Sequence, residues 1–217
     1  MSEIEGTINF AYDLKTANLA EAAWSDEVLG GIAQLSAWRS ILYTLELIGQ
    51  NTSRYGGFAY GNLSMRIEDS ERFIVTASQT SGATKLYVNH LVLIEETNIA
   101  RFWVEATGLE PPSSETITHA MIYQGEPRAR FVFHVHSNEI WKHREALRLP
   151  QTPAEVAYGS EAMAEAVVQL LEQHQIRPLI FATAGHEDGI FALGYHAQEC
   201  GSLLVSTLAR ARSIAQS

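Results

Sequence analysis

The run Arg130-Phe131-Val132-Phe133-His134-Val135-His136 constrains the fold more than any other stretch of this sequence. Its apolar, aromatic and β-branched residues are typical of a buried β-strand. Side chains alternate across a strand, so His134 and His136 project to one face while Phe133 and Val135 project to the other. Two imidazoles on one face can bind zinc or a similar divalent ion. The alternative is a pair of structural histidines satisfied by hydrogen bonds, and the pattern alone leaves both interpretations open.

A third metal ligand would come from the remaining histidines, which are His90, His119, His143, His174, His186 and His196. His186 is the best placed, because it lies in the tight connection between two apolar stretches, 178–182 and 189–193, that are predicted to be strands. Loop residues held by a sheet are common ligand positions. His186 is therefore the leading candidate to join the two histidines of the strand.

A carboxylate that fits beside such a metal is Glu115, which follows Pro112-Ser113-Ser114. A serine here can cap a helix whose first turn contains Glu115, and the helix dipole favours an acid at that place. The same position suits a general base close to N–H groups that could hold a phosphate. His119 follows one turn later on the same face, where it lines the site or orients a neighbour. Helix capping and catalysis both stay open for Glu115.

The order of helical and extended patterns predicts the fold class. The predicted helices are 26–50, 113–124, 137–144, 160–174 and 198–215, and the predicted strands are 63–67, 73–76, 91–95, 102–105, 129–136, 178–182 and 189–193. Alternating apolar residues within 8–14 allow a further short strand. This order indicates an α/β protein, a three-layer α/β/α sandwich around a central mixed, largely antiparallel sheet.

Composition excludes several classes of function and location. Lys and Arg number 15 against 25 Asp and Glu, a net charge of −10, whereas a nucleic-acid or anionic-membrane partner requires a basic patch. No apolar run approaches the roughly 18 residues of a membrane span. The N-terminus has no secretory signal pattern, and the single Cys200 cannot form an internal disulfide. We therefore expect a cytoplasmic protein with neither nucleic acid nor membrane as a partner.

Several stretches, in order along the chain, resemble the class II aldolase/adducin family, in particular its zinc-dependent aldolases of the L-fuculose-phosphate type. They are Gly61–Arg66, Val75–Ser78 with Thr80–Gly82, Pro112–Glu115 with His119 and Tyr123, the His134–His136 strand and, more loosely, Gly185–His186 with Gly189–Gly194. The resemblance spans about 28–215, so it implies a single domain over 1–217 in which 1–25 form an N-terminal extension. It also implies a homotetramer with active sites near subunit interfaces.

The resemblance assigns roles to individual residues. It implies that His134, His136 and His186 bind zinc or another divalent transition metal, and that Glu115 is the catalytic acid or base. It implies that the substrate phosphate is held by Asn62, Ser81, Gly82, Ser113 and Ser114. The implied reaction is retro-aldol cleavage of a small sugar phosphate, in which the metal stabilises an enediolate. Alternatives are a dehydratase or epimerase on the same site, or a non-catalytic adducin-like or metal-binding module. Glu rather than Asp at position 115 favours an aldolase or dehydratase over an epimerase.

Two departures from the family pattern affect the rim of the site. The connection His186-Glu187-Asp188-Gly189 is two residues longer than the usual His-Gly, so its acids either approach the metal or are ordinary loop acids. The segment 138–157 is short and has no tyrosine to match the family's proton donor. Tyr158 and Tyr195 are available, but neither can be aligned to that role, and the proton donor stays open.

Overall fold

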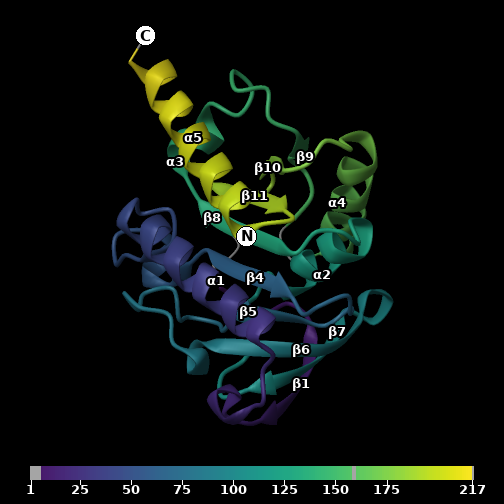
Figure 1. Ribbon diagram of the computed structural model, residues 1–217. Helices are drawn as coiled ribbons and strands as arrows, with labels where there is room; N and C mark the ends of the chain where they lie inside the picture. Colours follow the sequence, from purple (N-terminus) through teal and green to yellow (C-terminus); the bar gives the residue numbers. More distant parts are fainter. Residues whose placement is uncertain (1–5, 158–159, 217) are drawn as a thin grey trace.

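A computed structural model of the chain describes residues 6–157 and 160–216. Within this part the centre is a nine-stranded sheet of order β1-β7-β6-β5-β4-β8-β11-β10-β9 (Figure 1). The strands are β1 (Ala11–Thr16), β4 (Asn62–Arg66), β5 (Phe73–Thr76), β6 (Leu91–Asn98), β7 (Trp103–Gly108), β8 (Phe131–His136), β9 (Gln151–Thr152), β10 (Leu179–Thr183) and β11 (Gly189–Gly194). Both edge strands, β1 and β9, pair in parallel and all other pairs are antiparallel. The sheet is therefore mixed and largely antiparallel.

Five α-helices are present in the described residues: α1 (Asp26–Thr44), α2 (Thr116–Gly125), α3 (Asn138–Lys142), α4 (Glu161–Gln173) and α5 (Ala197–Ala215). Helices α1 and α5 contact each other and share one hydrophobic core with the sheet. Helices α2 and α4 contact each other and share a second core with the sheet. Figure 1 shows α2 beside α4, apart from α1 and α5. The predicted three-layer α/β/α sandwich is confirmed.

The alternation within β8 assigns its residues to the two layers. Phe131, Phe133 and Val135 belong to the core beneath α1 and α5, while Val132 belongs to the core beneath α2 and α4. Because side chains two apart share a face, His134 and His136 lie on the α2 side of the sheet. The strand therefore directs both imidazoles toward the layer that carries Glu115.

The first predicted helix, 26–50, is too long by six residues, since α1 ends at Thr44. Ser25 caps its start, accepting a hydrogen bond from the backbone N–H of Val28. After Thr44 the chain turns through Glu46, whose φ is +56°, and Leu47 and Ile48 are buried in an irregular turn. The prediction was too long because apolar residues continue at helical spacing beyond Thr44. These residues fill the core, but they are not part of the helix.

The N-terminal segment adds a strand to the sheet edge. The alternation within 8–14 corresponds to β1, which pairs with β7 from Ala11 opposite Trp103 to Thr16 opposite Gly108. A separate two-stranded ribbon, β2 (Gly49–Gln50) with β3 (Ala59–Tyr60), precedes β4. Across the described residues, every helix is too short or too polar to cross a membrane.

Candidate active site

Three histidines meet at one end of β8. His134 and His136 come from β8, and His186 comes from the connection between β10 and β11. Gly189, the first residue of β11, pairs with His136 of β8. The loop that carries His186 therefore ends beside the histidine pair. The Nε2 atoms of His134 and His136 are 3.1 Å apart, and one nitrogen from each of the three residues lies within 4.8 Å of the others. All three side chains are buried.

The geometry of this triad and the protonation of its two strand histidines fit a divalent metal. Zn–N bonds of about 2.05 Å at a tetrahedral angle place two ligand nitrogens about 3.3 Å apart, close to the distance between His134 and His136. Burial lowers the pKa of His134 to about 3, and burial lowers the pKa of His136 well below its ordinary value. Both imidazoles are therefore neutral at neutral pH, as a metal ligand must be.

Glu115 is placed at the start of α2 with its carboxylate turned toward the triad. Its Oε1 lies 3.3 Å from Nδ1 of His186 and 3.7 Å from Nε2 of His134, and the side chain is buried. Its Oε2 accepts a hydrogen bond of 2.7 Å from the hydroxyl of Thr118. Glu115 occupies the N-cap position, but its side chain makes no capping hydrogen bond. The carboxylate thus faces the histidines instead of the helix backbone.

The long connection after His186 is braced by its second acid. Asp188 is buried and accepts hydrogen bonds from the Tyr55 hydroxyl at 2.6 Å and from Nδ2 of Asn138 at 3.0 Å. Burial and the hydrogen bond to Asp188 raise the pKa of Tyr55, so its hydroxyl stays protonated. The Tyr55 ring also packs edge-on against the ring of His136. Asp188 therefore holds the loop, whereas the neighbouring Glu187 is exposed.

The sequence interpretation missed Tyr55. This residue lies in a glycine-rich loop, 133 positions from its partner Asp188. Its backbone φ of +48° is uncommon for a residue with a β-carbon, and only the structure reveals it. Tyr55, His136, Asn138 and Asp188 line a cavity of about 580 Å³. This cavity gives access to the triad from the side of His136.

Four of the five predicted phosphate-binding residues line one small cavity, which we name the anion pocket after its predicted ligand. These residues are Asn62, Ser81, Ser113 and Ser114. Asn62 pairs with His134 across β4 and β8, so the anion pocket is next to the triad. The Ser81 hydroxyl donates its proton to the carbonyl of Gly61 at 2.5 Å. The fifth residue, Gly82, does not line the pocket. A β-carbon on Gly82 would clash with the side chain of Gln50.

The anion pocket is narrow in this conformation. Its volume is about 10 Å³, enough for about one water molecule. Gly6 of the N-terminal segment and Gln79 belong to its wall, and a β-carbon at Gly6 would clash with the Gln79 amide. Ile8 and Phe10 hold this segment by packing against the core beneath α2 and α4. The N-terminal segment thus covers part of the pocket.

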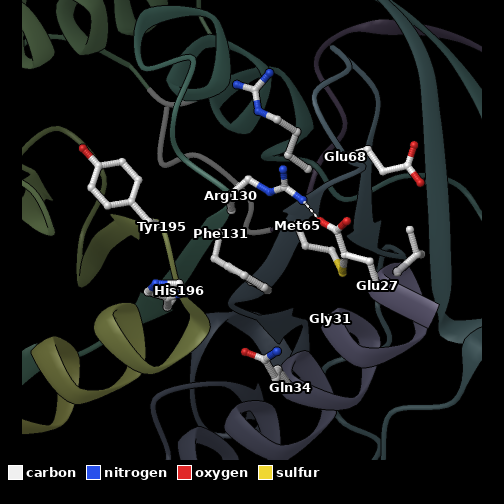
Figure 2. Close-up of a pocket in the computed structure, with 11 residues that line it drawn as sticks. Glu27, Gly31, Gln34, Met65, Glu68, Arg130, Phe131, Tyr195 and His196 are labelled. Carbon is white, nitrogen blue, oxygen red and sulfur yellow. Dashed lines mark hydrogen bonds and ion pairs between the residues drawn. The ribbon is translucent and has the colours of Figure 1, made fainter. Parts of the chain in front are cut away.

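A third cavity, of about 350 Å³, lies at the opposite end of β8, between α1 and the start of α5 (Figure 2). Met65 and Phe131 belong to its wall, and its Arg130 is ion-paired with Glu27 and Asp69. Tyr195 also lines this cavity, which separates it from the triad at the other end of the strand. Tyr158 lies outside the described residues.

A three-layer α/β/α domain with three buried histidines and a glutamate at one strand end defines a protein of the class II aldolase type. Residues 51–212 match the family model described as Class II Aldolase and Adducin N-terminal domain. The chain therefore belongs to this family, as its sequence motifs predict.

Solved structures with the same fold include three sugar-phosphate aldolases. The L-fuculose-1-phosphate aldolase from Thermus thermophilus has a TM-score of 0.62 and 19% identity, over 85% of this chain and 92% of that chain. The sugar-phosphate aldolase from Thermotoga maritima has a TM-score of 0.67 and 14% identity, over 88% of this chain and 95% of that chain. The L-fuculose 1-phosphate aldolase from Glaciozyma antarctica has a TM-score of 0.61 and 15% identity, over 92% of this chain and 79% of that chain. No curated protein matches the chain.

Proposed function

We propose that this chain is a metal-dependent carbon–carbon lyase that cleaves a small sugar phosphate by a retro-aldol reaction. The observation that carries the proposal is the position of Glu115, whose Oε1 lies 3.3 Å from His186 and 3.7 Å from His134. An acid beside three buried histidines combines a ligand set for a divalent ion with a group that can transfer a proton. Family membership and the names of the similar structures support the same reaction.

His134, His136 and His186 would hold the ion, for which zinc is the first choice. When bound, zinc supplies Lewis-acid polarisation of the substrate carbonyl. In the cleavage direction the hydroxyl of the departing fragment loses its proton as the carbon–carbon bond breaks and the aldehyde forms, and Glu115 gives a proton to the carbon next to the remaining carbonyl. The orientation of the Glu115 carboxyl group is held by the Thr118 hydroxyl. Burial of the carboxylate keeps bulk water away from this transfer.

The proposed substrate carries a phosphate because the anion pocket adjoins the triad. Asn62, Ser113 and Ser114 line the pocket, and α2 begins at Thr116, two residues after Ser114. The start of a helix favours an anion through its dipole and its N–H groups. The proposal extends to the implied homotetramer, to a single domain over residues 1–217 and to a cytoplasmic location.

Metal analysis of the purified protein is the first test. We expect bound divalent metal in the wild type and its loss in His134→Ala/His136→Ala. His174→Ala is the matched control, because His174 is exposed at the end of α4 and its loss should leave the metal content unchanged. Less than about one ion per four chains of wild type would overturn the proposal, since the folded triad should retain its metal during purification.

Aldehyde release from a panel of ketose phosphates is the second test. We expect cleavage of at least one of them by the metal-loaded wild type. Metal binding without cleavage of any ketose phosphate would support a metal-binding module in place of a lyase. Dehydration or epimerisation in the same panel would identify one of the alternative reactions.

A further inference from the structure

We propose that His119 is a positioning residue, which holds the side-chain amide of Asn62 so that its NH₂ group faces the anion pocket. The inference deepens the proposed function and rests on its phosphorylated substrate. His119 is fully buried in α2 and lies outside the pocket. It would therefore act through Asn62 and make no contact with the substrate.

His119 lies in a buried chain of hydrogen bonds that reaches the pocket. Its Nε2 is 2.6 Å from Oδ1 of Asn62, and its Nδ1 is 2.6 Å from the hydroxyl of Ser64. The Ser64 hydroxyl is in turn 2.7 Å from the hydroxyl of Tyr123. Asn62 and Ser64 share one face of β4, and His119 and Tyr123 share one face of α2. The chain therefore connects the helix to the sheet directly behind the pocket.

The protonation state of His119 determines which group donates in each of these hydrogen bonds. Burial lowers the pKa of His119 to about 3, so the ring is neutral and carries one N–H. Because Oδ1 of Asn62 can only accept, the proton lies on Nε2, and Nδ1 accepts from Ser64. Ser64 then accepts from the Tyr123 hydroxyl. With its oxygen engaged by His119, Asn62 presents its NH₂ group to the pocket.

A second amide in the pocket wall is oriented in the same way. Oε1 of Gln79 accepts a hydrogen bond of 3.0 Å from the backbone N–H of Ala59, so its NH₂ group lies against Gly6 in the pocket wall. The Ser113 hydroxyl accepts from the N–H of Glu115, so its own proton is also free to be donated. Among the described residues that line the pocket there is no Lys or Arg. Selection of an anion would therefore depend on how these neutral groups point.

The opposite orientation of Asn62 would reverse its effect. An amide flipped by half a turn places a carbonyl oxygen toward the bound anion, where the two oxygens repel each other. In the wild type that flip would either set the amide NH₂ against Nε2–H of His119 or move the His119 proton to Nδ1 and reverse the bonds through Ser64. The first leaves two donors facing each other, and the second leaves the proton of the buried Tyr123 hydroxyl without an acceptor among the described contacts. An unmade buried hydrogen bond is costly, so His119 holds Asn62 in the donor orientation.

The test compares inorganic phosphate binding to the full-length wild type and to His119→Phe, by isothermal calorimetry. A hydrogen bond to a charged group is worth a factor of about 10 to 100 in binding, so we expect Kd to rise about 10-fold or more. With a ketose phosphate, KM should rise by a similar factor while kcat changes little. Asn62→Ala should weaken binding as much, and the double variant should be no worse than Asn62→Ala alone.

Two further variants separate positioning from general destabilisation. Thr207→Val alters a buried polar residue of α5 far from the pocket and should leave Kd unchanged. His119→Gln can restore an N–H donor to Asn62, and its Kd should stay nearer to the wild-type value than that of His119→Phe. Histidine ¹⁵N shifts of the wild type should show His119 neutral with its proton on Nε2, a measurement that needs no variant.

The outcomes distinguish this inference from the proposed function. Phosphate binding by the wild type with an unchanged Kd in His119→Phe would overturn the positioning role alone. A proton on Nδ1 of His119 would also overturn it. No phosphate binding by the wild type would overturn the inference together with the phosphorylated substrate. Phosphate binding that depends on His119, without cleavage of any ketose phosphate, would support the inference while the proposed reaction fails.

Discussion

Oε1 of Glu115 lies 3.3 Å from Nδ1 of His186, although the first residue begins a helix on one side of the sheet and the second lies in a loop between two strands. The contact places a carboxylate beside the third histidine of the triad. Because of this contact, a substitution of Glu115 is the most direct way to separate metal binding from catalysis.

Glu115→Gln should leave the bound metal in place and lower kcat. The amide keeps the size of the side chain and can still accept from Thr118, but it cannot take up a proton. Loss of a general base costs about 10²- to 10⁴-fold in rate. Steady-state kinetics and metal analysis of one preparation test this. An unchanged rate would show that Glu115 only marks the start of the helix.

Asp188→Ala should weaken metal binding while Glu187→Ala does not. The first change removes the acceptor for Tyr55 and Asn138 and loosens the loop that carries His186. Partners that support metal ligands typically contribute about 10- to 100-fold in affinity. Competition with a chelator measures the affinity of each variant. Glu187 is the matched control, since it is exposed in the same loop, and equal losses in both variants would contradict the bracing role.

His119→Phe should reduce the loss of stability on acidification. The pKa of His119 falls from 6.5 unfolded to about 3 folded, so between these values the unfolded chain binds the additional proton. Stability is therefore lost as the pH falls through this window, by up to about 1.4 kcal/mol per pH unit for this one group. Urea unfolding of wild type and variant between about pH 6 and pH 4 should show this difference in slope. Parallel curves would indicate that His119 is protonated in the folded protein.

Removal of residues 1–7 should strengthen phosphate binding. Gly6 is part of the wall of the anion pocket, whereas Ile8 and Phe10, which pack on the core, are retained. The opened pocket should give a lower Kd for inorganic phosphate by calorimetry. Asn62→Ala in the truncated chain should abolish the gain, which would locate it in the anion pocket. An equal or higher Kd after truncation would show that the segment does not obstruct the ligand.

Gly201→Ala and Gly30→Ala should change stability in opposite directions. A β-carbon at Gly201 would clash with the Trp38 ring where α5 meets α1, and such overpacking costs about 1–3 kcal/mol. Gly30 is an exposed position within α1 where a β-carbon would meet open space, so alanine there should add about 0.5–1 kcal/mol. Urea or thermal unfolding of the two variants measures both. Destabilisation by Gly30→Ala would contradict the open surface at that place.

The sequence determined the elements and the faces of their side chains. Alternation in 129–136 predicted both the strand and the shared face of His134 and His136, because a strand repeats every two residues. Periodicity was less reliable where the core is filled by irregular chain, as at Leu47 and Ile48 after α1. Such residues are apolar because they are buried, and their helical spacing is not accompanied by a helix.

Only the tertiary structure decided which side chains meet. The order β4-β8-β11 brings Asn62, His134 and Phe191 side by side, and the packing of α2 on that sheet sets Glu115 against His186 and His119 against Asn62. The bond from Tyr55 to Asp188 likewise joins residues 133 positions apart. Local periodicity depends on neighbours a few residues away, whereas these contacts depend on strand order and layer packing. The sequence therefore predicted the chemical groups of the site, and the tertiary structure determined their distances and orientation.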